Sequence, residues 1–302
     1  GRHANVQFTS DWNKDAMRRD FTINAIYSDI EGRVFDPFNG RLDLSNGKIV
    51  FIGSPEERIQ EDYLRILRYF RFFIQYSKNK HDEKIILSIK KHINGINRIS
   101  NERIFEELKK LIKVENFYKL FLDIYSKEIV LNIFPQFKYH ERLQELKNLN
   151  KNLANKYDEY LILALIILDE SSNYEYFCHK YRVSSKVKNR FKNISENFEN
   201  LKNEKFYTNE NIKKMIYFTS KDYVIDLLLF SICANPKIKN INIELLLDYI
   251  KDCKIPKFPI SGEYLKNLGY ETGELLGKKL KSLEKKWIEN NFVLDEKKYE
   301  KD

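Results

Sequence analysis

Cysteine, proline and glycine are scarce in this sequence, whose 302 residues contain 3 cysteines, 6 prolines and 10 glycines. The cysteines, Cys178, Cys233 and Cys253, are odd in number and widely spaced. They form no metal-ligand spacing and argue against a disulfide framework, so reduced thiols in a cytoplasmic protein are predicted. Long apolar runs are also missing, because the longest, Leu161–Leu168, is too short to span a bilayer. No signal peptide is visible, and no membrane partner is expected.

Positive charge and aromatic residues are abundant instead. Lys and Arg number 53 against 44 Asp and Glu, which gives a formal net charge of +9, and aromatic residues make up 14% of the chain. The excess of positive charge favours a polyanionic partner, although charge alone does not identify it. A chain of this length can form a large core and more than one domain, and most of its aromatic residues are predicted to lie in that core.

The pattern of the chain changes near residue 54. Before it, Ala25–Ile30, Arg33–Phe35 and Ile49–Ile52 are short strand candidates separated by turn signals. After it, apolar residues recur at helical spacing almost to the end, and Ser54 followed by proline predicts a helix start. Ser100 predicts a second helix start. The predicted fold is therefore α+β and predominantly α.

The stretch Glu61–Arg71 has the clearest chemistry. Wound as one helix, it places Glu61, Arg65 and Arg68 on one face, with Asp62 and Arg71 at the edges of that face and apolar residues opposite. A carboxylate accepts from the amino group of cytosine or adenine, and arginine donates to ring acceptors and phosphates. This pairing suits a nucleotide. An exposed helix stabilised by ion pairs would have the same spacing.

Two earlier stretches add polar groups. In Arg18–Ala25, Arg19 can bind phosphate, and Asp20 and Asn24 can bind ribose hydroxyls. A strand–helix junction capped by Asp20 would also explain this stretch. The segment from Asp36 to Gly47 reads as a turn followed by a strand.

Together, these stretches resemble the motifs of the class II tRNA nucleotidyltransferase and poly(A) polymerase family. Arg18–Ala25 resembles its ribose-binding motif, and Asp36-Pro37, Gly40 and Asp43-Leu44 resemble the strand motif that joins head to neck. Glu61-Asp62 with Arg65 and Arg68 resembles the amino-acid template that pairs with the base of ATP or CTP. The resemblance continues in segments downstream: Ile99–Ile104 and Glu107-Leu108 in the neck, and Phe258–Gly262, Leu268-Gly269 and Trp287, which resemble the tail of bacterial CCA-adding enzymes.

The resemblance implies a domain order and residue roles. The implied parts are the end of a nucleotidyltransferase head with a mixed β-sheet (1–54), a helical neck with the template (55–113), a helical body (114–205) and a helical tail (206–302). The implied nucleotide-binding roles are triphosphate contact by Arg19, ribose contact by Asp20 and Asn24, base pairing by Asp62 and Arg65, orientation of Arg65 by Glu61, and phosphate binding or template support by Arg68 and Arg71.

One family motif has no counterpart in these 302 residues. The family places a Gly-Gly-x-x-Arg-Asp turn and an Asp-x-Asp pair before its ribose motif, and that pair holds Mg²⁺ for nucleotidyl transfer. Here no two aspartates are two positions apart, and Gly1–Ala4 resembles the stretch just after that motif. No catalytic or metal-binding residue is therefore assigned in this chain. We expect either a truncated piece or one product of a split gene, whose separate partner polypeptide would supply the Mg²⁺ ligands.

The predicted function is addition of CCA to tRNA from CTP and ATP. A poly(A) polymerase of the same family is the first alternative, because the motifs are shared. A tRNA-binding or RNA-binding fragment without catalysis is the second, because the Asp-x-Asp pair is missing. The lysines of the last predicted helix, Gly273–Asn290, fit either contact with RNA phosphate or a solvated helix face.

Overall fold

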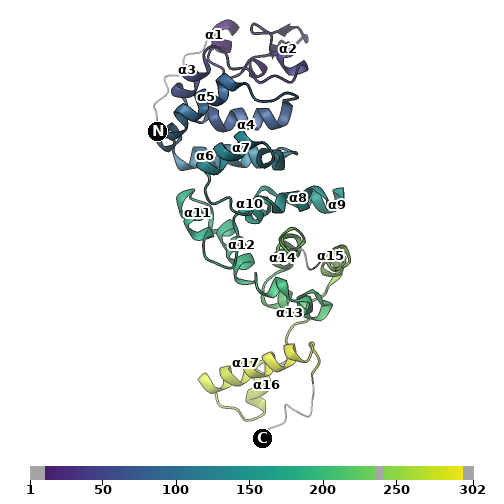
Figure 1. Ribbon diagram of the computed structural model, residues 1–302. Coiled ribbons are helices and arrows are strands. Elements are labelled where there is room, and N and C mark those ends of the chain that lie inside the picture. The colour runs from purple at the N-terminus through teal and green to yellow at the C-terminus, as the bar shows by residue number, and fades with distance from the viewer. Residues whose placement is uncertain (1–10, 236–237, 239–240, 295–302) are drawn as a thin grey trace. The chain divides into compact units, whose positions relative to one another are not determined.

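The computed structural model describes residues 11–235, 238 and 241–294, and the chain divides into two compact units, Gly1–Phe191 and Lys192–Asp302 (Figure 1). Helices predominate in both units. The one regular sheet of the described residues pairs β1 (Tyr27–Ser28) with β2 (Val34–Phe35) in antiparallel register. The α+β, predominantly α prediction is therefore confirmed. Gly1–Ala4, which resembles the stretch that follows the family's catalytic motif, lies outside the described residues.

The first unit begins with the head segment and continues through helices and short 3₁₀ segments (η). Its elements after the head are stacked as successive helical layers (Figure 1). In chain order, and apart from the two strands, they are α1 (Trp12–Met17), η1 (Thr22–Asn24), α2 (Gly40–Ser45), α3 (Pro55–Glu61), α4 (Arg65–Tyr76), α5 (Glu83–His92), η2 (Ile93–Arg98), α6 (Asn101–Ile112), η3 (Phe117–Phe121), α7 (Ile124–Ile133), α8 (Arg142–Lys147), α9 (Lys151–Ala154), α10 (Glu159–Ile167), α11 (Tyr174–Lys180) and α12 (Ser185–Glu196), which crosses into the second unit.

The regular elements in the described part of the second unit are all helices. Helix α14 is buried along most of its length, and α17 packs Leu283 against Ile260 and Leu265. Its elements after α12 are η4 (Asn200–Lys202), η5 (Glu204–Tyr207), α13 (Asn209–Phe218), α14 (Lys221–Ala234), α15 (Ile243–Asp252), α16 (Gly262–Asn267) and α17 (Glu274–Glu289).

An aromatic cluster joins the head segment to helix α4. The ring centroids of Phe21 and Phe51 are 4.5 Å apart, and Phe21 also meets Phe72 of α4 at 5.3 Å. The backbone supports this contact, because the amide of Ile52 donates to the carbonyl of Asp20 over 3.0 Å. The strand predicted at Ile49–Ile52 is thus reduced to a single bridge between Phe21 and Phe51. Burial of the rings fixes the polar residue next to Phe21, Asp20, against α4.

The strand predicted after Asp36 was wrong, because residues Gly40–Ser45 form the short helix α2. The Asp36 carboxylate accepts hydrogen bonds from the amides of Gly40 at 2.7 Å and Arg41 at 2.9 Å. These bonds satisfy amides that an isolated helix start leaves without partners. Gly40 is needed for the close approach, since a Cβ there would lie 2.2 Å from the carbonyl oxygen of Thr22.

Several helix starts follow their sequence signals. Ser54 caps α3 by accepting from the amide of Glu57, and Pro55 occupies the first turn. Ser100 occupies the N-cap position of α6. The most apolar predicted helix, at Tyr160–Leu168, corresponds to α10, which is buried on nearly every side. In these three helices the structure agrees with the capping signals and the hydrophobic pattern of the sequence, although the Ser100 side chain makes no capping hydrogen bond.

Candidate nucleotide-binding site

The single helix predicted over Glu61–Arg71 was wrong, because the chain breaks at Asp62. Helix α3 ends at Glu61, Asp62 is extended with φ −153° and ψ 104°, and α4 begins at Arg65. The Asp62 carboxylate accepts from the amide of Leu64 at 3.2 Å, and its carbonyl accepts from the amide of Arg65 at 3.0 Å. Aspartate favours this local side-chain bond over continuing a helix. The break places Asp62 in the turn between α3 and α4 and outside both helices.

Glu61 and Arg65 form an ordered ion pair across this break. Nη1 of Arg65 donates to Oε2 of Glu61 at 2.6 Å and to the backbone carbonyl of Arg58 at 2.7 Å. The hydrogen bond from Arg65, outweighing the effect of burial and aided by Arg58, lowers the pKa of the Glu61 carboxyl. Glu61 therefore stays ionised and holds one corner of the Arg65 guanidinium. Nε and Nη2 of Arg65 make no hydrogen bond to the residues that the structure describes, and they remain available as donors.

Asp62 pairs with a residue of helix α6, and not with Arg65. Nη2 of Arg103, in the first turn of α6, lies 2.7 Å from Oδ2 of Asp62. Both side chains are partly exposed and line a cavity of about 660 Å³ that also borders Glu61 and Tyr63. The cavity thus has a carboxylate acceptor on its wall.

A buried ion network joins the Arg18–Ala25 stretch to helices α4 and α6. Asp20 is 5% exposed, and its carboxylate accepts from its neighbour's amide at 3.1 Å, from Nδ2 of Asn24 at 3.0 Å and from Nε of Arg68. Burial alone would raise the pKa of the Asp20 carboxyl, but the hydrogen bond and charge of Arg68 outweigh it, so the pKa is lowered. Arg71 donates to Glu107 of α6 at 2.6 Å, and Glu107 also lies 4.0 Å from Arg68.

Arg19, in the same Arg18–Ala25 stretch, is held by a separate set of contacts. Its guanidinium donates to Oδ2 of Asp15 at 2.9 Å and lies over the ring of Tyr27, 5.9 Å from the centroid. The hydrogen bond from the Tyr27 hydroxyl, followed by that from Arg19, lowers the pKa of the Asp15 carboxyl to about 2. The Arg19 side chain remains 44% exposed, so it is oriented without being enclosed.

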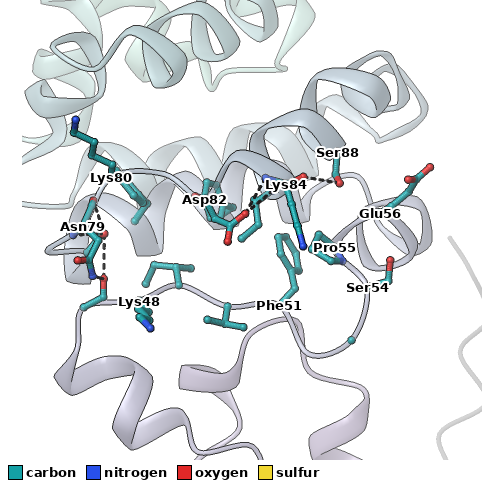
Figure 2. Close-up of a pocket in the computed structure, with 18 residues that line it drawn as sticks. Lys48, Phe51, Ser54, Pro55, Glu56, Asn79, Lys80, Asp82, Lys84 and Ser88 are labelled. Carbon is teal, nitrogen blue, oxygen red and sulfur yellow. Dashed lines mark hydrogen bonds between the residues drawn. The ribbon is translucent and has the colours of Figure 1, made fainter.

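A larger cavity lies apart from these residues, between the segment at Phe51 and the start of α5. Figure 2 shows its lining, which includes Lys48 and Lys84 together with Asp82 and Ser88. Its volume is about 690 Å³, and none of the eight residues predicted to bind nucleotide lines it. The predicted site is therefore distinct from this cavity.

Comparison with known proteins connects this arrangement with a family. The profile described as "Poly A polymerase head domain" matches residues 1–50, and the profile "Probable RNA and SrmB- binding site of polymerase A" matches residues 81–140. The mitochondrial CCA tRNA nucleotidyltransferase 1 of Mus musculus is 32% identical over 302 residues, covering 98% of this chain and 67% of that protein. The chain belongs to the CCA tRNA nucleotidyltransferase family.

Other members of this CCA tRNA nucleotidyltransferase family are similar over comparable lengths. The CCA-adding enzyme of Lactococcus lactis is 27% identical over 96% of this chain and 70% of its own length. Among solved structures, the CCA-adding enzyme of Bacillus stearothermophilus in complex with CTP has a TM-score of 0.65 at 19% identity and covers 97% of this chain and 73% of its own. The Thermotoga maritima enzyme complexed with tRNA has a TM-score of 0.63 at 20% identity, over 95% and 72% of the two chains. At these identities, the structures support the fold of the family.

The described residues do not fit the metal ion expected for this nucleotidyltransferase family. No group of three or more His, Cys, Asp and Glu side chains in the described part of the chain is placed to hold a metal ion. The same part contains no helix that is long and apolar enough to cross a membrane.

Three contacts of this site were missed in the sequence. Glu107 interrupts the apolar face of α6. An acidic residue at such a position indicates a buried carboxylate that needs a basic partner, and this is the feature from which the contact could have been predicted. Arg58 lies three residues before Glu61, which is an ion-pair spacing on a helix. Arg103 was assigned to the neck without a partner. Only the folding of α6 beside α4 and the Asp62 turn places Glu107 and Arg103 beside the predicted residues.

Proposed function

We propose that this chain supplies the base-reading template and an RNA-binding surface for addition of CCA to the 3′ end of tRNA, using CTP and ATP. One observation carries the proposal: Arg65 is clamped at one nitrogen while its other donors stay free, next to the turn that presents the Asp62 carboxylate. A donor fork and a carboxylate acceptor are the two groups that can read the edge of cytosine or adenine.

The remaining roles and the four-part domain division follow from the same proposal. Arg19, exposed and oriented by Asp15, contacts the triphosphate, and the Asp20–Asn24 pair contacts the ribose. Arg68 and Arg71 support the template through Asp20 and Glu107. The two catalytic carboxylates that would hold Mg²⁺ would come from an Asp-x-Asp segment, whether joined to this chain or provided by a separate polypeptide. The cytoplasm remains the predicted location.

The proposal predicts specific binding of tRNA by the purified chain. Lys281 and Lys286 are exposed on α17, and the chain carries a net charge of +9. Because each phosphate contact releases counterions, affinity should fall by roughly 10³-fold or more between about 50 and about 200 mM salt if six or more phosphates are contacted. A filter-binding titration measures this. Equal affinity for tRNA and for an unstructured RNA of the same length would contradict tRNA recognition.

A second candidate function, RNA binding without catalysis, is favoured by the absence of any aspartate pair two residues apart in these 302 residues. It leads to a separate prediction: the chain on its own should not incorporate labelled CTP into a tRNA that lacks its CCA end, with or without Mg²⁺. Adding a segment that carries the Asp-x-Asp pair should restore incorporation. Robust incorporation by the 302-residue chain alone would show that other carboxylates serve the reaction.

A further inference from the structure

Arg58 of α3 connects two parts of the proposed site. Its side chain is only 11% exposed, although it carries a charge. Nη1 donates to Oε2 of Glu61 at 2.5 Å, and Nη2 donates to the backbone carbonyl of Arg19. The backbone carbonyl of Arg58 accepts from Nη1 of Arg65 at 2.7 Å. One residue therefore contacts the carboxylate that holds Arg65, Arg65 itself and the backbone beside the ribose motif.

We propose that Arg58 is a positioning residue that sets the orientation of the Arg65 guanidinium for base discrimination and aligns it with Arg19. This inference rests on the proposed function and adds to it a residue that touches no base or phosphate. Arg58 acts through its neighbours, because Nη1 donates to Glu61 and Nη2 to the Arg19 carbonyl, while Nε is buried without a hydrogen-bond partner among the described residues.

Arg58 can orient Arg65 because both side chains donate to the same oxygen of Glu61. Oε2 of Glu61 accepts from both Arg58 and Arg65, at 2.5 and 2.6 Å. Glu61 is 51% exposed, so without Arg58 its carboxylate could rotate into solvent and carry the Arg65 fork with it. An arginine side chain loses about 2 kcal/mol of rotamer freedom when fixed, and here Glu61 and the Arg58 carbonyl provide the fixing contacts. Reading a base edge depends on that fixed direction, whereas binding a triphosphate does not.

The link to Arg19 adds a second constraint. The bond from Arg58 to the Arg19 carbonyl joins residues 39 apart in sequence, and thus ties the ribose-motif turn to the end of α3. Arg58 makes no hydrogen bond or ion pair with Asp62 among the described residues, and Asp62 is held by Arg103 and by the Leu64 amide. Substitution of Arg58 should therefore disturb the donor half of the template and leave the acceptor half in place.

The test is equilibrium binding of CTP, ATP, UTP and GTP to the 302-residue chain, with inorganic tripolyphosphate as a probe that has no base. Wild type should bind CTP and ATP more tightly than UTP and GTP. Arg58→Lys keeps the charge but loses the fork, and it should reduce that preference at least about fivefold, the low end for a bidentate contact. Tripolyphosphate affinity should change by less than about twofold. The matched control is Arg33→Lys, in an exposed ion pair with Asp29, which should leave both quantities unchanged.

Glu61→Gln, at an exposed position, supplies the second variant. Because Arg58 and Glu61 act on the same guanidinium, the double variant should lose no more preference than either single variant. A wild-type preference that persists unchanged in Arg58→Lys would overturn the inference, even if the melting temperature falls. If Arg58→Lys does not fold, Glu61→Gln decides the test. Loss of the preference for CTP and ATP in that variant supports the inference, and an unchanged preference overturns the inference. Absence of any preference in wild type would instead contradict the proposed function.

Discussion

Replacing Glu107 by alanine is expected to lower the free energy of unfolding of the first unit by about 3 kcal/mol. Glu107 is 2% exposed and lies 2.6 Å from Arg71, 3.5 Å from Lys110 and 4.0 Å from Arg68. Its removal leaves the guanidinium of Arg71, itself 15% exposed, without a counter-charge. A cavity of about 420 Å³ beside Arg71 and Lys110 admits water, which keeps the loss at the low end of the usual range for a broken buried pair.

The chain offers its own reporter and control for this measurement. Of its two tryptophans, Trp12 belongs to the first unit and Trp287 to the second. In a Trp287→Phe background, urea unfolding followed by tryptophan fluorescence therefore reports on the first unit. Glu106→Ala removes an adjacent acid that is 63% exposed and paired with Lys109, and should cost at most about 0.5 kcal/mol. Equal losses for the two variants would show that Glu107 is not the centre of the ion network.

Replacing Asp62 by alanine is expected to change which nucleotides are incorporated, in an enzyme where this chain is combined with an Asp-x-Asp segment. The carboxylate attracts the amino group of cytosine and adenine and repels the carbonyl at the same place in uracil and guanine. Removing it should reduce discrimination by about 1–3 kcal/mol, roughly 5- to 150-fold. Asp62→Asn should blur the choice similarly, because an amide both donates and accepts. Arg65→Ala should also blur it.

The contrast with Arg19→Ala makes this test specific. Arg19 is proposed to contact phosphates, so its loss should weaken all four nucleotides by similar factors. Arg103→Met removes the partner of Asp62 but leaves the acceptor, and should keep the exclusion of UTP and GTP. The measurement is incorporation of each NTP into a tRNA that ends at the discriminator base. If Asp62→Ala slows CTP and ATP while UTP and GTP remain as strictly excluded, the template assignment is wrong.

The sequence alone determined the helical scaffold and the kinds of residue at the site. Ser54, Pro55 and Ser100 mark helix starts that the structure has, and the apolar run near Leu161 became the buried helix α10. These features depend on neighbours within a few positions, which is why they can be read from spacing. The family could be identified because Arg18–Ala25 and Glu61–Arg71 carry side chains whose identity, rather than conformation, is distinctive.

The tertiary structure alone decided how those side chains are paired. Arg68 bonds to Asp20 from 48 positions away, Arg103 to Asp62 from 41, and Arg71 to Glu107 from 36. A pattern of neighbouring residues cannot predict contacts between residues so far apart in the sequence. The break at Asp62 is a similar case. The hydrophobic spacing of the sequence fits one uniform helix, but Tyr63 packs against Gly95 and the Asp62 carboxylate accepts from the Leu64 amide. These two contacts favour the turn. A buried charge is costly unless the fold places a partner beside it. Here the fold pairs Glu107 with Arg71 and Arg58 with Glu61.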